Sequence, residues 1–434
     1  MHPQPGWSAS AITGRYGFGG HPRSITELAG PNKVVRTDAR RRPETEIGAD
    51  AELDATIAPD TRIPTSVPDP RAVFVTGAAG FLGAHLVRQL ATDTNAQIRC
   101  LVRAADARAA HTRIMDALRR YRLWRPDIAA RVVAVAGDLT EPEFGLTAPE
   151  YRTHCAEVDV IVHNGARVNH AEPYARLRVA NVIGTASILR FACTGPDKPV
   201  HFVSTTSVGS ATVAGPRLTV HETRPGLDVL AGNGYVLSKW VGEELMAQAA
   251  DRGLPTVIHR PDRICGSSRT GATSSDDAVW LLIRAAVLLG GSLPARGTEL
   301  SLVPADYVSA AIVHMMTSGA ATAVHHLVNR TSVPLDTVWE RLRRKGFDVA
   351  VASATELAAR LAVGAGTDGD LAKALILGER ATFAGYRQSW DDTNTRNALS
   401  GSGIVCPPMT IDLIDRHIDY FIDTGFLPRP KPLG

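Results

Sequence analysis

Short, almost wholly apolar runs alternate with amphipathic helical stretches from residue 71 onward, and this alternation limits the possible folds more than any other feature. Strands that helices cover on both faces must be apolar throughout, and such strands occur in parallel sheets. The pattern therefore predicts an α/β protein with a doubly wound parallel sheet. The expected strands are 72–76, 97–102, 132–136, 158–163, 200–205, 255–260 and 324–329. The expected helices between them are 81–91, 105–122, 171–192 and 234–251.

Segments that do not fit this alternation divide the chain into parts. The sheet and its helices are expected to form one domain over 71–266, to which the chain returns at about 300–330 and which has a helical insertion at about 105–130. Segments 267–299 and 331–434 are too long and irregular to be simple crossovers. They predict a smaller, mainly helical C-terminal substrate domain over the carboxyl edge of the sheet, where open α/β sheets bind ligands.

The N-terminal region follows neither the strand pattern nor the helix pattern. Residues 1–45 are rich in Gly, Pro, Ser and Arg, so we expect a disordered or loose tail there. Residues 46–70 indicate one short helix and then a linker with several prolines. The start has no apolar stretch typical of a secretory signal, and the most apolar run, 278–290, is short and interrupted by Arg284. We therefore expect a cytoplasmic protein.

Composition excludes several classes of function. The 434 residues are 44% hydrophobic and 21% charged, as in ordinary globular proteins, and a net charge of +3 is too small to indicate nucleic acid binding. The five cysteines are scattered and form no CxxC pair, which indicates free thiols in a reducing compartment. No HExxH pattern occurs, so no metal site is expected.

A glycine-rich turn, TGAAGFLG, follows the first expected strand and opens the first expected helix, with its glycines spaced GxxGxxG. Backbone without side chains lets a pyrophosphate approach closely, and the unpaired N–H groups of a helix N-terminus attract it. In this strand–turn–helix context the motif predicts a Rossmann-type dinucleotide site. Its expected contacts are Thr76, Gly77, Gly80, Phe81, Leu82 and Gly83.

The end of the second expected strand indicates which dinucleotide binds. An NAD site would place Asp or Glu there to accept from the ribose 2′-hydroxyl, but this chain has Arg103. A guanidinium suits a 2′-phosphate, so the sequence favours NADPH, and Arg113 in the following helix could close on the same phosphate. A solvated surface charge is the alternative for each arginine, and for Arg113 the two interpretations are about equally supported.

Two further strand ends have candidate cofactor contacts. GDL follows the third strand, where Asp138 could accept from the adenine amino group, with Leu139 next to it. HNGA ends the fourth strand, and its small residues let the backbone approach the cofactor ribose; ordinary turn chemistry is the alternative for both motifs. The expected contacts in HNGA are Asn164, Gly165 and Ala166. We interpret His163, which begins HNGA, as a packing residue and not a catalytic one.

A candidate proton donor follows in GYVLSKW, which places Tyr235 and Lys239 on one face of an expected helix. A phenol titrates at about pH 10 in water, and a neighbouring ammonium should lower the pKa of Tyr235. Tyr235 would then be a competent proton donor to a carbonyl that receives hydride, and Lys239 could also hold the cofactor ribose. A YxxxK spacing is often accidental, but this one lies about 150 residues after the glycine motif, between the fifth and sixth strands.

A hydroxyl group from VHFVSTTSVG should complete this site. It would hydrogen-bond the substrate oxygen together with Tyr235 and form a small oxyanion site. The register of the strand end selects Thr205, with Ser204 and Thr206 as alternatives. Each of these hydroxyls could instead stabilise the turn that follows the strand.

These motifs together resemble a known family, the thioester reductase (terminal reductase, R) domains of nonribosomal peptide and polyketide synthases and of carboxylic acid reductases. This family belongs to the extended short-chain dehydrogenase/reductase superfamily. The resemblance rests on TGAAGFLG, CLVRA, GDL, HNGARVNHAEPY, NVIGT, FVSTTSVG, YVLSK and RPDRICG, and it covers roughly 46–430. Two stretches, 106–146 and 391–428, favour this family over its relatives that modify sugars.

The resemblance implies roles for single residues. The catalytic set that it implies is Thr205, Tyr235 and Lys239, and the phosphate-binding pair is Arg103 and Arg113. It gives Asn181 of NVIGT a structural role and places Pro261 in a loop beside the nicotinamide. It also implies that the substrate is a thioester, whose carbonyl accepts hydride more readily than a carboxylate. Hydride addition and loss of the thiolate would release an aldehyde, and a second hydride could give an alcohol.

The expected partner is a phosphopantetheine carrier protein. The chain has no P-loop, no adenylating region and no carrier serine motif, so we expect either that an activated acyl group arrives in trans on such a carrier or on CoA, or that this chain is a piece of a larger synthase. Carrier proteins are acidic, and basic residues in the insertion are candidates for a docking surface. They are Arg119, Arg120, Arg122 and Arg125. A solvated helix face is an interpretation at least as well supported.

Three other functions stay open. A nucleotide-sugar epimerase or dehydratase has the same sheet and triad, but it normally prefers NAD, which Arg103 disfavours. A relative that cyclises its substrate without redox chemistry would be expected to lack the tyrosine, and Tyr235 is present. A cofactor-sensing scaffold without turnover would not need an intact set of threonine, tyrosine and lysine.

Overall fold

The structure is a computed structural model. It describes residues 44–61, 63–170, 172–210, 219–224, 233–292, 298–319, 323–353, 356–357, 359–360 and 389–430. The loose tail expected at residues 1–45 therefore lies almost wholly outside the described residues. The short helix expected after it is confirmed as α1 (Glu44–Asp50).

Seven strands form one parallel sheet in the order β12-β7-β5-β4-β1-β2-β3. The strands are β1 (Ala72–Thr76), β2 (Gln97–Val102), β3 (Val132–Ala136), β4 (Val160–His163), β5 (Val200–Val203), β7 (Thr256–Pro261) and β12 (Val324–Leu327). All seven predicted strands are present, each within two residues of its expected ends. The strand order reverses between β1 and β4, which is the switch point where doubly wound sheets bind ligands. The predicted fold class is confirmed.

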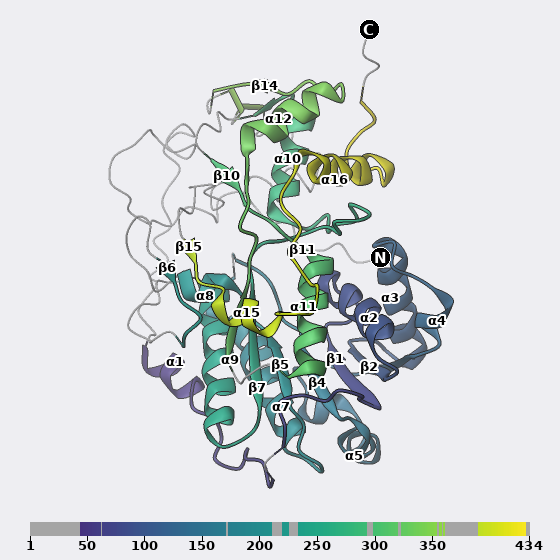
Figure 1. Ribbon diagram of the computed structural model, residues 1–434, viewed down its shortest axis with the longest axis vertical. Helices are drawn as coiled ribbons and strands as arrows, with labels where there is room; N and C mark the ends of the chain where they lie inside the picture. Colours follow the sequence, from purple (N-terminus) through teal and green to yellow (C-terminus); the bar gives the residue numbers. More distant parts are fainter. Residues whose placement is uncertain are drawn as a thin grey trace, which may run out of the picture.

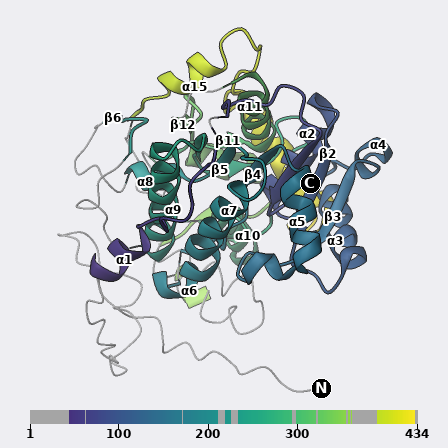
Figure 2. The same cartoon turned by 90° about the horizontal axis from the view of Figure 1, so that it is seen from below.

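Helices cover both faces of this sheet (Figures 1 and 2). One face packs on α2 (Phe81–Asp93), α3 (Ala107–Arg120) and α11 (Ala305–Ser318). The other face packs on α5 (Ala148–Glu157), α7 (Gly184–Ala192) and α9 (Gly234–Asp251). Successive side chains of β1 alternate between the two cores, with Val73 and Val75 in the first and Phe74 in the second. This alternation between two buried faces is why the strand is apolar at every position.

The helix predicted over 171–192 is one element in the sequence pattern but three in the structure. It consists of α6 (Tyr174–Arg178), a π-helical turn η4 (Val179–Ile183) and α7. Asn181 lies in this turn, where its side chain accepts from Arg167 N at 2.7 Å and donates to Arg167 O at 3.0 Å. The Asn181 amide also contacts Ser238 Oγ of α9 at 2.9 Å. These contacts agree with the structural role implied for Asn181 and place a π-bulge where it supports a site.

The remaining helices either follow strands of the sheet along the chain or lie at one end of the sheet. They are α4 (Pro126–Ala129), η3 (Pro142–Gly145), α8 (Thr206–Ser210), α10 (Ala278–Leu289), α12 (Leu335–Arg344), α15 (Thr393–Ala398) and α16 (Ile411–Asp423). Short strands pair two by two as β10 (Glu299–Leu300) with β13 (Val333–Pro334), β11 (Val303–Pro304) with β8 (Ile264–Cys265), β14 (Ala350–Val351) with β9 (Gly291–Ser292), and β15 (Ser389–Trp390) with β6 (Thr219–Val220). In Figure 1, α10, α12 and α16 gather at the top, away from the sheet.

One cluster of buried side chains joins this helical part to the sheet. It runs from β1 and α2 through α11 to Trp280 of α10, Leu342 of α12 and Phe421 of α16. The boundaries expected for a separate substrate domain stay a prediction. The expected insertion at about 105–130 forms α3 and α4, which connect β2 to β3.

Candidate active site

The turn between β1 and α2 is too tightly packed for side chains. Gly77 has φ +69°, and a Cβ on it would lie 2.9 Å from Gly165 Cα. A Cβ on Gly83 would lie 2.0 Å from Gly77 O, so the first turn of α2 rests directly on the loop. Gly80 is the N-cap of α2 and has no side chain with which to cap it. The arrangement is a backbone cradle at a helix N-terminus, as a pyrophosphate requires.

His163 joins this turn to the strand beside it. Thr185 donates its hydroxyl proton to Asn181 O at 2.7 Å, so His163 Nε2 donates to Thr185 Oγ1 at 3.1 Å. His163 Nδ1 then accepts from Thr76 Oγ1 at 2.8 Å, and Thr76 Oγ1 accepts from Gly165 N at 2.7 Å. Burial lowers the pKa of His163 to about 3, so it is neutral at pH 7. His163 is thus buried and hydrogen-bonded on both ring nitrogens, which agrees with its interpretation as a packing residue.

Two arginines meet at the ends of β2 and β3. Arg103 follows β2, and its guanidinium lies 4.0 Å from the Asp138 carboxylate with 78% of the side chain exposed. Arg113 of α3 donates a hydrogen bond to the backbone carbonyl of Arg103. Asp138 Oδ1 in turn accepts from the backbone N of Thr140 at 3.0 Å. The structure thus brings the two predicted arginines together beside Asp138, where an exposed cationic pair can meet a phosphate.

The other predicted cofactor contacts surround the glycine turn. A Cβ on Gly165 would lie 2.7 Å from Leu139 Cδ1, which places Leu139 against the HNGA turn. Asn164 Nδ2 lies 3.4 Å from Gly77 O. Pro261 ends β7 and pairs with Leu327 of β12.

Lys239 is buried in α9 and points to the end of β5. Its Nζ donates to Val203 O at 2.7 Å and lies 4.0 Å from the centroid of the Phe202 ring. Burial lowers the pKa of Lys239 to about 7, and the Glu243 carboxylate opposes this shift. Lys239 therefore loses its proton more readily than an exposed lysine.

Tyr235 lies one turn before Lys239 in the same helix. Its backbone N donates to Asn233 Oδ1 at 2.9 Å, so the residue is fixed by the N-cap of α9. Burial raises the pKa of Tyr235 to about 12. The expectation that Lys239 lowers this pKa is wrong for the chain as the structure shows it, because burial disfavours the phenolate and the ammonium is engaged with Val203 O. Tyr235 therefore keeps its proton at neutral pH.

Three hydroxyl groups follow β5, and their contacts differ. Ser204 Oγ donates to the Glu243 carboxylate, and Thr206 Oγ1 donates to Asp262 Oδ1 at 3.2 Å. Among the described residues, the side-chain contacts of Thr205 Oγ1 are long and local, at 3.2 Å to Ser207 N and 3.3 Å to Ser207 Oγ. Thr205 is also half-buried, whereas Ser204 and Thr206 are buried. The geometry favours Thr205 as the hydroxyl that can turn toward a substrate.

Comparison with known proteins identifies the family. The NAD-binding family described as "Male sterility protein" matches residues 75–312. The terminal R domain from the myxalamid PKS-NRPS biosynthetic pathway has a similar structure, with a TM-score of 0.80 and 37% sequence identity, over 89% of this chain and 99% of that one. The chain belongs to the terminal reductase (R) domain family. It is an oxidoreductase with a nicotinamide cofactor.

Two curated relatives place this R domain among synthases. It is 36% identical over 365 residues to a linear gramicidin synthase of Brevibacillus parabrevis, a match that covers 82% of this chain and 7% of that synthase. It is 34% identical over 403 residues to isonitrile lipopeptide synthase of Streptomyces coeruleorubidus, over 88% of this chain and 26% of that protein. The R domain thus spans only a small part of the length of these relatives.

Two residues that lie beside Tyr235 and Lys239 were not predicted from the sequence. The ring of His170 meets the Tyr235 ring edge-on, with centroids 4.8 Å apart. Glu243 lies one turn after Lys239 and forms a wholly buried ion pair with Arg260 at 2.5 Å. The sequence does contain an indication of the second, because an acid four residues after Lys239 lies on the same helix face.

The arginines expected to form a docking surface are partly neutralised. Three of them pair with carboxylates of the same R domain: Arg119 with Asp116, Arg122 with Asp423 and Arg125 with Asp127. All three pairs are exposed, so each contributes little to stability. The local positive charge is smaller than the sequence suggests.

Neither a metal site nor a membrane-spanning helix occurs among the described residues of the R domain. There, no three side chains of His, Cys, Asp or Glu converge in a way that could hold a metal ion. Within the same residues, no helix combines the length and the apolar character needed to cross a membrane.

Proposed function

We propose that this R domain reduces a thioester-bound acyl or peptidyl group with NADPH and releases it as an aldehyde. The observation behind this proposal is the position of Tyr235, Lys239 and Thr205. A buried, protonated phenol and a half-buried hydroxyl lie at the carboxyl edge of a sheet whose first turn is a dinucleotide cradle. A site of this kind suits delivery of a proton to an oxygen that gains negative charge.

The residues present fit NADPH. The side-chain-free turn at Gly77 and Gly83 suits the pyrophosphate, and the arginine pair at Arg103 and Arg113 suits a 2′-phosphate. No carboxylate follows directly after β2 to accept from a ribose 2′-hydroxyl, since Arg103 occupies that position. The chemistry that NADPH supplies when bound is a hydride for the carbonyl carbon.

The side chains of Tyr235 and Thr205 would stabilise the negative charge that develops on the substrate oxygen. As the carbon–oxygen π electrons move to oxygen, Tyr235 donates its proton and Thr205 donates a hydrogen bond, which gives a hemithioacetal. Loss of the hydroxyl proton then re-forms the carbonyl, the carbon–sulfur bond breaks, and the thiolate leaves with the electron pair. The released product is an aldehyde, and addition of a second hydride and a proton to its carbonyl, with no leaving group, would give an alcohol. Lys239 would hold the cofactor ribose and later return a proton to Tyr235.

The acyl donor is proposed to be a phosphopantetheinylated carrier protein that acts in trans, with a CoA thioester as the smaller equivalent. The relatives are synthases, which supports a carrier-bound substrate. The five cysteines are all free, which supports a reducing, cytoplasmic setting. Arg120 has no carboxylate partner among the ion pairs of the described residues, so it is the first residue to reverse in a test of docking.

The catalytic part of the proposal is tested with pantetheine-linked acyl groups. Purified R domain is incubated with NADPH and each thioester, and the product masses are recorded. Tyr235→Phe should reduce kcat by roughly 10²- to 10⁴-fold, the usual contribution of a general acid, with NADPH affinity unchanged. Tyr420→Phe is the matched control, because it removes a phenol that donates to Arg120 O at 2.9 Å, far along the chain in α16. Full activity in Tyr235→Phe would contradict the proposal.

The cofactor part is tested with the arginine pair. Arg103→Ala combined with Arg113→Ala should raise the Kd for NADPH by about ten- to a hundredfold, since charge-assisted hydrogen bonds contribute about 1.5–3 kcal/mol. The Kd for NADH should stay unchanged. Arg108→Ala removes an exposed arginine from the same helix and is the control. Equal losses for both cofactors would show that the arginines do not bind a 2′-phosphate.

A further inference from the structure

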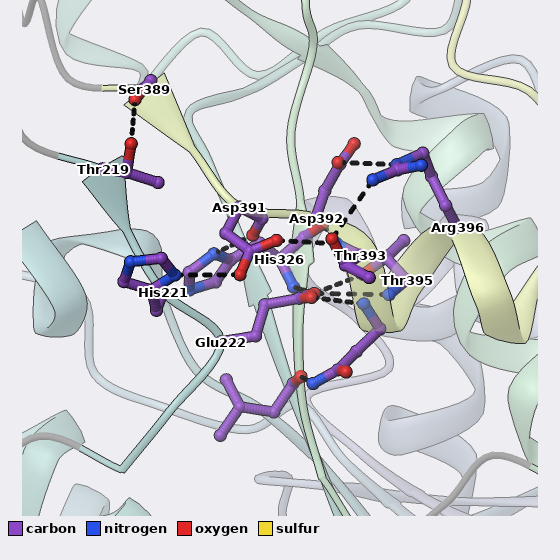
Figure 3. A network of polar contacts seen from close by, with 12 residues as sticks. Thr219, His221, Glu222, His326, Ser389, Asp391, Asp392, Thr393, Thr395 and Arg396 are labelled. Carbon is purple, nitrogen blue, oxygen red and sulfur yellow. Dashed lines mark hydrogen bonds and ion pairs between the residues drawn. The ribbon is translucent and has the colours of Figure 1, made fainter.

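The chain between Thr205 and Tyr235 is attached to a distant C-terminal segment. Residues 219–224, here called the bridging segment, lie against residues 389–396, here called the C-terminal clamp. β6 and β15 pair in parallel, with Thr219 opposite Ser389 and Val220 opposite Trp390. Figure 3 shows the two segments and the polar side chains between them.

Glu222 is the centre of this contact. It is buried, with 8% of its surface exposed, and its carboxylate accepts hydrogen bonds from two other segments. One donor is the backbone N of His326 in β12, at 2.7 Å. The others belong to the clamp: Asn394 N at 2.5 Å, Thr395 N at 3.3 Å and Thr395 Oγ1 at 2.9 Å (Figure 3). A single carboxylate therefore joins the bridging segment, the edge of the sheet and the clamp.

The other polar contacts between the two segments lie at the surface. Thr219 Oγ1 and Ser389 Oγ are 2.7 Å apart, and His221 Nδ1 lies 3.0 Å from Asp391 Oδ2. Both contacts are exposed to solvent, so each can exchange with water at little cost. Glu222 differs because removal of its carboxylate would leave buried N–H groups without an acceptor. Glu222 is therefore the buried side-chain contact of this attachment, beside the backbone pairing of β6 with β15 and the hydrogen bond from Asp391 N to Val220 O at 2.9 Å.

The same contacts continue to the catalytic residues. His326 Nδ1 donates to Asp391 O at 2.7 Å, which leaves Nε2 to accept from Arg260 Nη1 at 3.3 Å. Arg260 pairs with Glu243, one turn after Lys239 in α9. Glu243 also accepts from Ser204, the residue before Thr205. A series of buried and half-buried contacts thus leads from the clamp to Ser204, the neighbour of Thr205, and to Glu243 in α9, the helix that contains Tyr235.

We propose that Glu222 is a positioning residue, which fastens the bridging segment to the C-terminal clamp and to His326, and so keeps the contacts that end at Ser204, beside Thr205, in the arrangement that accepts the thioester. This inference rests on the proposed thioester reduction. Glu222 touches neither the glycine turn nor the arginine pair, so its effect should fall on the thioester and not on NADPH.

The test compares variants of Glu222 in the full chain. Glu222→Ala should lower kcat/KM for an acyl pantetheine thioester at least tenfold, while the Kd for NADPH changes less than twofold. Glu222→Gln retains one acceptor oxygen and should recover part of the loss. Thr219→Ala removes only the exposed hydroxyl contact of the same strand pair and should behave as wild type. Amide hydrogen exchange should rise in 219–224 and in the clamp but not in α2.

Two results would overturn the proposal. One is a Glu222→Ala protein whose kcat/KM for the thioester stays within twofold of wild type. The other is a parallel loss of NADPH binding and thioester turnover, which would indicate general unfolding. If Glu222→Ala does not fold, Thr395→Val, which removes a single donor to the carboxylate, should lower kcat/KM about threefold, and no change there would also contradict the proposal. Wild type that reduces no thioester would instead refute the proposed function, and the exchange experiment would still test the fastening.

Discussion

Acid should destabilise this R domain through histidines buried in its sheet. His201 of β5 and His259 of β7 stack with centroids 5.3 Å apart, and Nδ1 of the first lies 3.1 Å from Nε2 of the second. His325 of β12 stacks on His259 in turn. Burial lowers the pKa of His201 to about 3 and that of His259 well below its usual value. These rings are therefore neutral in the folded protein, whereas an unfolded chain protonates them below about pH 6.5.

The sign and the size of the effect follow from linkage. Because the unfolded chain binds more protons, the stability from a buried neutral histidine is complete above about pH 6.5 and is lost as the pH falls toward about 3. One such group removes about 1.4 kcal/mol per pH unit, or about 2.7 kcal/mol between about pH 6.5 and 4.5. His163 and His201, which do not touch, together remove about 5 kcal/mol. That is a large part of a typical stability of about 5–15 kcal/mol.

The assay is denaturant-induced unfolding at about pH 7, 5.5 and 4.5. His201→Phe keeps a ring in the stack and removes one titration, so the slope of unfolding free energy against pH should fall by about 1.4 kcal/mol per unit below about pH 6. His111→Gln, an exposed change in α3, is the control and should leave the slope unchanged. The same slope in His201→Phe and wild type would refute the reasoning, since His201 would then not be a buried neutral group.

Three further substitutions test single contacts. Gly83→Ala puts a Cβ 2.0 Å from Gly77 O. We therefore expect a loss of about 1–3 kcal/mol in stability and at least tenfold weaker NADPH binding by calorimetry. Normal NADPH binding would show that this turn does not hold the pyrophosphate. Thr205→Val should lower kcat about 10²- to 10³-fold in NADPH oxidation assays, whereas an equal loss in Thr206→Val would favour the alternative hydroxyl. Lys198→Met removes an ammonium that donates to backbone carbonyls after α7, including Thr194 O at 2.8 Å. The free energy of unfolding should fall by about 2–3 kcal/mol in denaturant titrations. An unchanged unfolding midpoint would contradict this expectation.

The sheet could be predicted because its physical cause is local. Each strand is buried on both faces, as Val73 and Phe74 show by facing opposite cores, so the apolar runs are continuous and easy to delimit. The glycine turn could be predicted for a similar reason, since a Cβ on Gly83 would meet Gly77 and Ala78 of the same turn, whereas the close approach of Gly77 to Gly165 joins distant parts of the chain. The proposed binding of a pyrophosphate at this turn follows from backbone geometry alone.

The contacts that the sequence pattern did not indicate depend on partners far along the chain. Glu222 is an ordinary acid in the sequence, and the donors that make it central lie 104 and 172 residues away at His326 and Asn394. No proline or glycine within 179–183 indicates the π-turn in the sequence. The turn places Asn181 where its side chain contacts Arg167 and Ser238 of α9. Spacing along one helix could bring Tyr235 and Lys239 together, but it could not show how deeply either is buried.

The burial of Tyr235 and Lys239 connects these two residues to the buried contacts around Glu243. Removing charge from solvent raises the pKa of Tyr235 and lowers that of Lys239, so both effects favour the neutral pair. Glu243 is the charge that opposes this for Lys239, and Glu243 itself stays compensated because Arg260 pairs with it. Arg260 in turn contacts His326, which donates to the C-terminal clamp. The protonation of Lys239 and the attachment of the bridging segment therefore depend on one connected set of contacts.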